Sequence, residues 1–212
     1  SPGSGEPDNE DPNWNHMISR DTSPDKSNSR LPAVFTDWFA ARGWVPHPHQ
    51  LEMVRAARQG LDSLVIAPTG GGKTLSGFLA SMVEMADDQP DGLHTVYISP
   101  LKALAVDIHR NLEAPISEMG LPIRVETRTG DTPQSKRARQ KADPPHILLT
   151  TPESLALMIS YEEAWTLFAG LKRVVVDEAH ALAGTKRGDQ LALCMARLNR
   201  IAPECRRVGL SA

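Results

Sequence analysis

The sequence has 212 residues, which is enough for one large domain or for one domain with a tail. Lysine and arginine number 23 and aspartate and glutamate 26, so the net charge of −3 gives no overall basic field that would attract nucleic acid. Its apolar runs are shorter than the roughly 20 residues that span a membrane. The composition therefore excludes membrane, collagen-like and disulfide-rich classes, and it favours a cytoplasmic protein in which Cys194 and Cys205 are reduced.

The first thirty residues differ in composition from the rest. They contain six serines, four prolines and four asparagines, and six acidic residues against three basic ones. A segment this poor in apolar side chains cannot offset the entropy lost on ordering. We expect a disordered tail over residues 1–30, with His16-Met17 resembling a junction between a tag and a native start, and one domain over residues 31–212.

The first half of this domain is predicted to begin with two helices and to continue with strands and helices in turn. Apolar residues at helical spacing indicate a helix over 34–39 and a second over 50–59, which Gly60 ends. The expected elements that follow are a strand at 64–67, a helix at 73–85, a strand at 95–98 and a helix at 103–119 that Pro115 must kink or end.

The second half repeats this alternation. The expected elements are a strand at 123–127 near a sheet edge, a basic helix at 134–141, a strand at 147–149, a helix at 154–159, a strand at 174–176, a helix at 188–199 and a strand beginning at 207–210. Strands separated by helices predict an α/β fold, with a mostly parallel sheet covered by helices on both faces. Because the sequence stops directly after a strand, we expect a domain that is cut short at its C-terminal end.

A phosphate-binding loop follows the first strand. Three glycines allow backbone N–H groups to surround phosphate oxygens, and the helix that follows adds its positive end. In such a P-loop the lysine reaches the terminal phosphates and the last hydroxyl binds Mg²⁺. The alternative, a flexible glycine turn, does not explain the strand before and the helix after. The predicted ATP-binding residues are Ala67, Pro68, Thr69, Gly70, Gly71, Gly72, Lys73 and Thr74.

An acidic pair stands directly after the valine strand at 174–176. Asp177 is predicted to be a second Mg²⁺ contact, together with Thr74. Glu178 can polarise the attacking water as a general base, and His180 can hydrogen-bond to another segment and respond to the nucleotide. The alternative is a solvated helix start whose acids satisfy backbone N–H groups. We assign Lys73, Asp177, Glu178 and His180 as the candidate catalytic residues.

These two motifs together resemble the helicases of superfamily 2, and shorter strings in the expected order extend the resemblance. Gln50, in Pro48-His49-Gln50, resembles the Q-motif glutamine that reads adenine. Phe35, Trp38 and Trp44 either pack near the base or belong to the core, and Ser211-Ala212 resembles the start of the Ser-Ala-Thr motif. Segments similar to motifs Ia, Ic and Ib imply nucleic-acid contacts by Pro100, Lys102, Thr129, Gly130, Thr151, Pro152 and Glu153.

Longer strings narrow the resemblance to the large helicase-related (Lhr) family and, within it, to the bacterial ligase-associated DEXH-box branch. These strings are RGWVPHPHQ, YISPLKALAVDI, VETRTGDTPQSKR and TTPESLAL. The resemblance implies the N-terminal RecA-like motor domain of an ATP- and Mg²⁺-dependent helicase that moves 3′ to 5′ on single-stranded DNA in repair. It also implies a second RecA-like domain and a DNA ligase as partners. DEAH stands here where this branch usually has DELH or DEVH.

Several alternatives stay open at this point. The strand could be RNA, and the chain could be a nucleotide-binding module without turnover of its own. The basic stretch 136–141 is either a solvated helix face or a phosphate contact. His47 and His49 could ligate a metal, but no cysteine or carboxylate cluster accompanies them.

Overall fold

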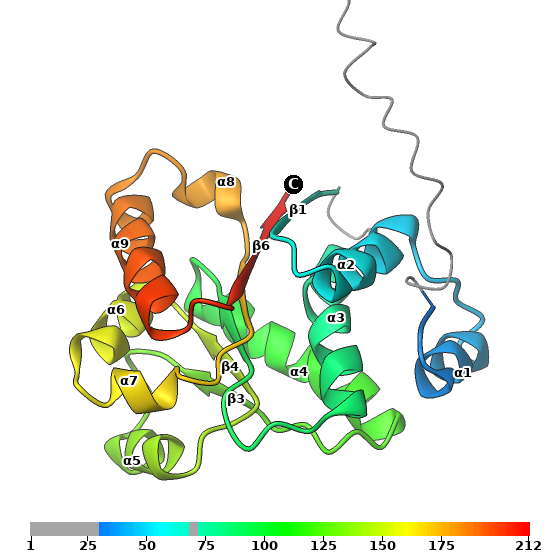
Figure 1. Ribbon diagram of the computed structural model, residues 1–212, viewed down its shortest axis with the longest axis horizontal. Coiled ribbons are helices and arrows are strands. Elements are labelled where there is room, and N and C mark those ends of the chain that lie inside the picture. The colour runs from blue at the N-terminus through cyan, green and yellow to red at the C-terminus, as the bar shows by residue number, and fades with distance from the viewer. Residues whose placement is uncertain (1–29, 68–71) are drawn as a thin grey trace, which may run out of the picture.

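The computed structural model describes residues 30–67 and 72–212, and its centre is a six-stranded parallel sheet (Figure 1). The strands are ordered β1-β6-β5-β2-β4-β3, and each neighbouring pair is parallel. This confirms the predicted α/β class and the edge position of the third strand. The bounds are β1 Ser63–Ile66, β2 Thr95–Ile98, β3 Val125–Arg128, β4 Ile147–Thr150, β5 Arg173–Val176 and β6 Arg206–Ser211.

Helices cover both faces of this sheet (Figure 1). One hydrophobic cluster fills the space between the sheet and the helices on each face. Tyr97 of β2 packs with the first four helices, whereas its neighbours Val96 and Ile98 pack with α6 to α9. This is the period of two expected of a strand that is buried on both sides. The helices among the described residues are α1 Ala33–Ala41, α2 Pro48–Arg58, α3 Lys73–Asp87, α4 Lys102–Glu118, α5 Gln134–Ala142, α6 Pro152–Ser160, α7 Ala164–Leu167, α8 Ala179–Leu182 and α9 Lys186–Ile201.

The fourth helix confirms the predicted range of 103–119 to within one residue, but it does not end at Pro115 and continues to Glu118. Proline removes one backbone N–H donor, but the carbonyl of Pro115 still accepts from the N–H of Met119 at 3.1 Å. Leu112 and Ile116, which flank the proline, are 2% and 6% exposed in the core. Their packing holds the last turn in helical geometry.

Two short helices, α7 and α8, were not predicted, because four residues are too few to show a helical period. No helix in residues 30–67 and 72–212 is long and apolar enough to cross a membrane. Since all six strands are parallel, their carboxyl ends meet at one edge of the sheet. The segments that follow β1, β2, β3, β4 and β5 carry every candidate site residue except Gln50, which lies in α2.

Candidate nucleotide site and nucleic-acid interface

The end of the predicted phosphate loop is held between β1 and α3. Ala67 is buried, and its N–H donates to the Ser211 carbonyl at 3.1 Å. Pro68, Thr69, Gly70 and Gly71 lie outside the described residues. Gly72 has φ +70°, a backbone conformation that favours glycine, and a Cβ there would also lie 2.7 Å from Gln50 Nε2. Lys73 and Thr74 then form the first turn of α3.

Lys73 is 7% exposed and its ammonium group pairs with Glu178. Lys73 Nζ lies 3.3 Å from Glu178 Oε1. A buried ammonium group is costly unless an anion or hydrogen-bond acceptors compensate it. The Glu178 carboxylate therefore pairs with the same ammonium group that the sequence analysis predicts to bind the ATP phosphates.

Asp177 is fixed by two hydrogen bonds and is 5% exposed. Its Oδ2 accepts from the Tyr97 hydroxyl at 2.5 Å, and its Oδ1 accepts from the Glu178 N–H at 2.9 Å. Tyr97 stacks on Phe78 of α3, with ring centroids 4.7 Å apart. Burial raises the pKa of the Tyr97 hydroxyl far above its usual value of 10.0, and the Asp177 carboxylate raises it further, so the hydroxyl remains a donor.

Tyr97 was missed by the sequence analysis, which took residues 95–98 only as a strand. A tyrosine within an otherwise apolar buried strand is the signal that could have found it, because a buried hydroxyl needs a polar partner. The pairing register also places Tyr97 opposite Val175, two residues before Asp177.

Glu178 is held in an unusual backbone conformation. Its φ of +48° makes it the one non-glycine residue in the left-handed region among the residues that the structure describes. Such positions cost about 1–3 kcal/mol and persist where the surroundings impose them. Glu178 Oε2 lies 3.2 Å from His180 Nε2, and His180 Nδ1 lies 2.9 Å from the Ser211 hydroxyl. A polar chain thus runs from Lys73 through Glu178 and His180 to the last strand.

Gln50 lines a pocket of about 440 Å³ beside the phosphate loop. Its Oε1 accepts from the His47 N–H at 2.9 Å, and its Nε2 lies 3.3 Å from the Gly72 carbonyl, to which it donates. Gln50 is 2% exposed. The pocket is lined by Phe39, Gly43, Trp44, Val45, His47, Gln50, Gly72 and Leu75.

The three aromatic residues near Gln50 have different roles in the packing. Phe35 is fully buried in the core, in agreement with the core alternative. Trp38 and Trp44 meet edge to face at 5.7 Å, and the Arg42 guanidinium lies 4.9 Å and 5.1 Å from their ring centroids. Trp44 is 53% exposed and lines the pocket, although the Arg42 guanidinium lies over its ring.

The motif Ia-like and Ib-like segments are joined by Arg187 of α9. One terminal nitrogen of Arg187 donates to the Pro100 carbonyl at 2.7 Å, and its Nε donates to Glu153 Oε1 at 2.6 Å. Arg187 lowers the pKa of the Glu153 carboxyl. Thr151 caps α6 by accepting from the Ser154 N–H, and Pro152 is buried in the first turn. Lys102 begins α4, and its side chain lies outside what the structure describes.

The motif Ic-like turn follows β3 at the same edge. The Thr129 N–H donates to the Thr132 hydroxyl at 2.9 Å, and Arg137 donates to the Gly130 carbonyl at 2.6 Å. The Thr150 hydroxyl donates to the Arg128 carbonyl at 2.7 Å and ties this turn to β4. The structure thus brings the Thr129–Gly130 turn next to Thr151.

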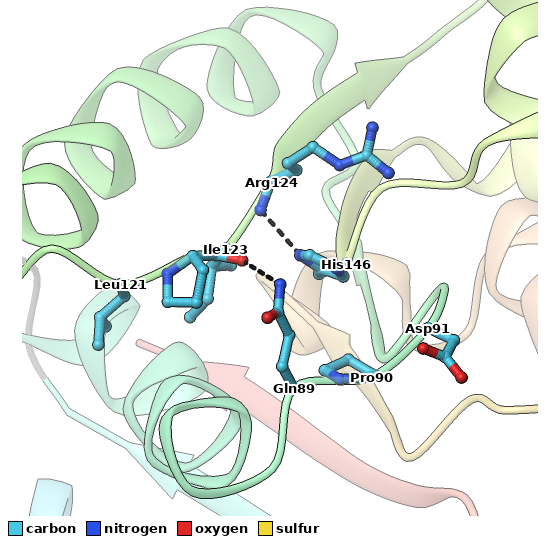
Figure 2. Close-up of a pocket in the computed structure, with 8 residues that line it drawn as sticks. Gln89, Pro90, Asp91, Leu121, Ile123, Arg124 and His146 are labelled. Atoms are coloured by element: carbon cyan, nitrogen blue, oxygen red, sulfur yellow. Dashed lines mark hydrogen bonds between the residues drawn. The ribbon is translucent and has the colours of Figure 1, made fainter.

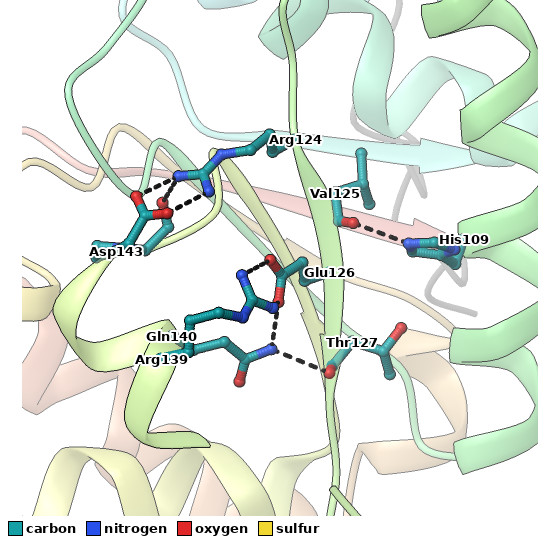
Figure 3. Close-up of polar contacts among 9 residues, drawn as sticks. His109, Arg124, Val125, Glu126, Thr127, Arg139, Gln140 and Asp143 are labelled. Atoms are coloured by element: carbon teal, nitrogen blue, oxygen red, sulfur yellow. Dashed lines mark hydrogen bonds and ion pairs between the residues drawn. The ribbon is translucent and has the colours of Figure 1, made fainter. Parts of the chain in front are cut away.

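Two basic residues of α5 are paired with acids, and Figure 3 shows one of these pairs, Arg139 with Glu126. Arg139 forms a two-point contact with Glu126 of β3 at 2.9 Å and 2.7 Å, and Lys141 lies 3.1 Å from Glu163. Gln140 also donates to Glu126, at 2.8 Å. The two alternatives for the stretch 136–141 were a solvated helix face and a phosphate contact. These ion pairs occupy Arg139 and Lys141 within the protein, so they favour a surface helix face over a phosphate contact for these two residues.

Two other expectations concern metals and thiols. His47 and His49 stack with ring centroids 5.2 Å apart, and no group of three or more metal-binding side chains occurs in the described part of the chain. Cys194 and Cys205 are both free and buried, and burial raises the pKa of each thiol, that of Cys205 to about 11. Neither thiol is suited to act as a nucleophile.

A larger hollow of about 600 Å³ lies at the opposite edge of the sheet (Figure 2). Gln89, which lines it, donates to the Pro122 carbonyl at 2.9 Å, and the Arg124 N–H donates to His146 Nδ1 at 3.0 Å. Arg124 and His146 directly precede β3 and β4, so this hollow is at the amino ends of the strands. None of the predicted site residues lines it, and its size alone does not make it the functional site.

Comparison with known proteins shows the family of the chain. The model of the DEAD/DEAH box helicases matches residues 47–212. The chain belongs to this family. Within it, the chain is 43% identical over 197 residues to the "Lhr helicase/ probable uracil glycosylase" of Mycolicibacterium smegmatis, covering 86% of this chain and 13% of the relative. It is 40% identical over 210 residues to the "ATP-dependent helicase Lhr-Core" of Methanocaldococcus jannaschii, covering 92% of this chain and 25% of that relative.

Solved structures give the same result. The Mycobacterium smegmatis helicase Lhr bound to ssDNA and AMP-PNP has 43% identity and a TM-score of 0.79, covering 86% of this chain and 25% of that one. The DUF1998 helicase MrfA bound to DNA and AMPPNP has 28% identity and a TM-score of 0.77, covering 86% of this chain and 26% of that one. The chain thus spans a quarter or less of the length of the two curated relatives. The ligase-associated branch stays a prediction.

Proposed function

We propose that the chain is the first motor domain of an ATP-dependent DNA helicase or translocase of the Lhr type. The observation that carries the proposal is the contact between Lys73, at the start of α3, and Glu178, after β5. It joins the end of the phosphate loop to the acidic pair within one polar cluster. A P-loop ATPase needs these two elements within reach of the same phosphate.

ATP would be held by Gln50 at the base and by Lys73 at the phosphates, along with the loop residues 67–72. The donor set fits Mg²⁺, because the Thr74 hydroxyl and the Asp177 carboxylate are hard oxygen ligands. Asp177 retains lone pairs beside the two hydrogen bonds that fix it. Mg²⁺ is usually bound by one or two protein oxygens plus phosphates and water. When bound, the ion would neutralise charge on the phosphate oxygens.

Hydrolysis would begin with an exchange of partners at Lys73. A nucleotide phosphate would replace Glu178 as the partner of the ammonium group, and the freed carboxylate would orient water and accept its proton. Tyr97 would keep Asp177 in place throughout. His180 contacts both Glu178 and Ser211, so a movement of Glu178 would affect Ser211. Ser211 is the first residue of the segment that resembles the Ser-Ala-Thr motif.

The nucleic-acid strand would cross the carboxyl edge, over Pro100, Lys102, Thr129, Gly130, Thr151, Pro152 and Glu153. Binding through phosphates makes such contacts dependent on salt and nearly blind to sequence. DNA is favoured over RNA because the two solved relatives at 43% and 28% identity are described as bound to ssDNA and to DNA. A 3′-to-5′ polarity follows only from the resemblance.

We also propose a role in DNA repair. The name of the Mycolicibacterium smegmatis relative joins a helicase to a probable uracil glycosylase, and glycosylases act on single bases of nucleic acid. The resemblance to the ligase-associated branch adds a DNA ligase as a partner. We place the protein in the cytoplasm, where the buried thiols of Cys194 and Cys205 would stay reduced.

The test is ATP turnover by the full-length protein with single-stranded DNA or single-stranded RNA of the same sequence. We expect DNA to stimulate phosphate release more than RNA. Glu178→Gln should bind ATP and lose turnover, because an amide cannot accept the proton. Glu113→Gln, at an exposed carboxylate of α4, is the matched control. Greater stimulation by RNA would show that RNA is the preferred strand. If the full-length protein has no ATP turnover, the chain belongs to a nucleotide-binding module and not to a motor.

A further inference from the structure

Two arginines near the carboxyl end of β3, Arg128 and Arg137, have no acidic partner among the residues that the structure describes. Arg128 is the last residue of the strand and is 6% exposed. No hydrogen bond or ion pair joins its guanidinium to any residue that the structure describes. The nearby arginines differ: Arg124 pairs with Asp143 and Arg139 pairs with Glu126, each through two contacts (Figure 3).

Arg137, in the first half of α5, has the same deficit. Its terminal nitrogen donates to the Gly130 carbonyl at 2.6 Å and to the Thr129 carbonyl at 3.3 Å, which are both neutral acceptors. Its Nε is buried and has no hydrogen-bond partner within residues 30–67 and 72–212. A buried donor without an acceptor costs about 1–3 kcal/mol, and more when it is charged.

These two cations are close enough to repel each other. Burial lowers the pKa of the Arg128 guanidinium, and the charge of Arg137 lowers it further. An arginine stays charged in a protein, so this unfavourable environment is not relieved by loss of a proton. Two uncompensated guanidinium groups therefore leave a local excess of positive charge in a chain whose net charge is −3.

The neighbouring groups indicate which anion the site would take. Glu126, two residues before Arg128 on the same strand, is already occupied by Arg139 and Gln140. Arg128 pairs in register with Thr150, one residue before Thr151, so the site adjoins the proposed path of the strand. A planar guanidinium fork matches phosphate oxygens, and two forks can share one phosphate group.

We propose that Arg128 and Arg137 together bind one phosphodiester of the nucleic-acid strand beside the Thr129–Gly130 turn. The proposal rests on the function proposed above, and it adds two positions that the motif resemblance does not include. Arg137 would act twice: its contacts to the Thr129 and Gly130 carbonyls shape the turn, and its guanidinium places a second positive charge beside Arg128. Free inorganic phosphate carries the same chemistry, so the test separates the two sources.

The experiment measures the affinity of full-length protein for single-stranded DNA by fluorescence anisotropy between 50 and 200 mM salt, the range in which phosphate contacts are resolved. Arg128→Gln and Arg137→Gln should each weaken binding about 10-fold or more. The double variant should lower the salt slope by about 0.7, the share of one single-strand phosphate. Arg124→Gln, whose guanidinium pairs with Asp143 at the other edge, should change neither value.

Neutral methylphosphonate linkages, placed one at a time along the strand, give a readout that a structural role would not change. One position should weaken binding by the wild type and have no added effect on Arg128→Gln, because the two changes remove the same contact. Arg128→Lys should recover part of the affinity. Inorganic phosphate at millimolar concentration should compete weakly, since strand binding is multivalent.

Each failure has a separate reading. If the wild type does not bind single-stranded DNA, the proposed function is wrong. If it binds and every methylphosphonate position acts equally on wild type and variant, the arginine site is wrong although the function stands. If Arg128→Gln does not fold, Arg137→Gln with the methylphosphonate series decides the same question. If free phosphate competes strongly and no methylphosphonate position couples to Arg128→Gln, the two arginines bind free phosphate and not a phosphodiester of the strand.

Discussion

Lys73 and Glu178 are 105 residues apart in sequence, yet the Lys73 ammonium lies 3.3 Å from the Glu178 carboxylate. The contact joins the two motifs whose cooperation ATP hydrolysis requires. It also sets up a competition, because the same ammonium group is the predicted partner of the ATP phosphates. If Lys73 and Glu178 have the roles proposed for them, binding of the nucleotide phosphates and release of the Glu178 carboxylate would be one event.

The competition predicts opposite effects for changes of its two members. Lys73→Ala should abolish measurable ATP binding, because the phosphates lose their side-chain cation. Glu178→Gln should bind ATP as tightly as the wild type or a few-fold more tightly, because the amide competes less for Lys73. Titration calorimetry measures both, and Lys172→Ala, an exposed lysine at the opposite edge, is the control. Unchanged affinity in Lys73→Ala would falsify the phosphate-loop assignment.

Gln50 should discriminate between bases. In this structure its amide oxygen is occupied by the His47 N–H and its amide nitrogen by the Gly72 carbonyl. We expect Gln50→Ala to weaken ATP binding about 5- to 30-fold and GTP binding less, because one or two hydrogen bonds to adenine are worth about 1–2 kcal/mol. Competition of each nucleotide against a fluorescent ATP analogue measures the two losses. Equal losses for ATP and GTP would show that Gln50 supports the phosphate loop through Gly72 and does not contact the base. Gln59→Ala, at the exposed end of α2, is the control.

Tyr97 should stabilise the protein through Asp177. Tyr97→Phe keeps the ring stacked on Phe78 but removes the donor to a carboxylate that is 5% exposed. We expect the free energy of unfolding to fall by about 1–3 kcal/mol, because the buried acceptor loses a partner. Urea denaturation measures it, with Tyr161→Phe, at a half-exposed position, as the control. A loss within about 0.5 kcal/mol, as at an ordinary surface position, would remove this role.

A second buried network, at the amino edge of the sheet, predicts the acid sensitivity of the fold. Burial raises the pKa of Glu84, but contacts with His94 and Arg173 outweigh it and lower the pKa from 4.5 to about 2. A carboxyl group whose pKa is lowered in the folded state stabilises that state at pH values above its unfolded pKa. For Glu84 this stabilisation is lost as the pH falls from about 4.5 towards 2.

Glu84→Gln should therefore destabilise the protein at pH 7 and flatten the fall in stability below pH 4.5. Arg173 is 2% exposed, so removal of its carboxylate partner should cost about 3 kcal/mol. Thermal unfolding over pH 2.5 to 7 measures both effects, with Glu113→Gln as the exposed control. An identical pH profile for wild type and Glu84→Gln would show that Glu84 has no such role.

The sequence was sufficient for the order of the elements because buried parallel strands and amphipathic helices leave different periods. It also placed Lys73, Asp177 and Glu178 in one cluster, since parallel strands end at one edge. It could not show that Tyr97 holds Asp177, because strand alternation does not give the strand order. The unpaired state of Arg128 was equally out of reach, because it depends on which acids α5 has already engaged. Pro115 was misjudged as a possible helix end because tertiary packing holds the last turn of α4.

The last prediction separates nucleotide binding from turnover. This chain contains the groups that we propose for Mg²⁺ and for the attacking water. A trans-acting arginine of a second domain is expected to stabilise the transition state, and such a group is commonly worth 10³–10⁵ in rate. We expect the 212-residue chain to bind Mg²⁺-ATP weakly and to hydrolyse it barely above background. Single-stranded DNA should stimulate it little, because one RecA-like domain offers half of the cleft. The full-length protein should gain several orders of magnitude, about 4–7 kcal/mol at 1.36 kcal/mol per tenfold. Steady-state phosphate release from both proteins, with and without DNA, measures this difference, and robust DNA-stimulated turnover by the 212-residue chain would overturn the two-domain mechanism.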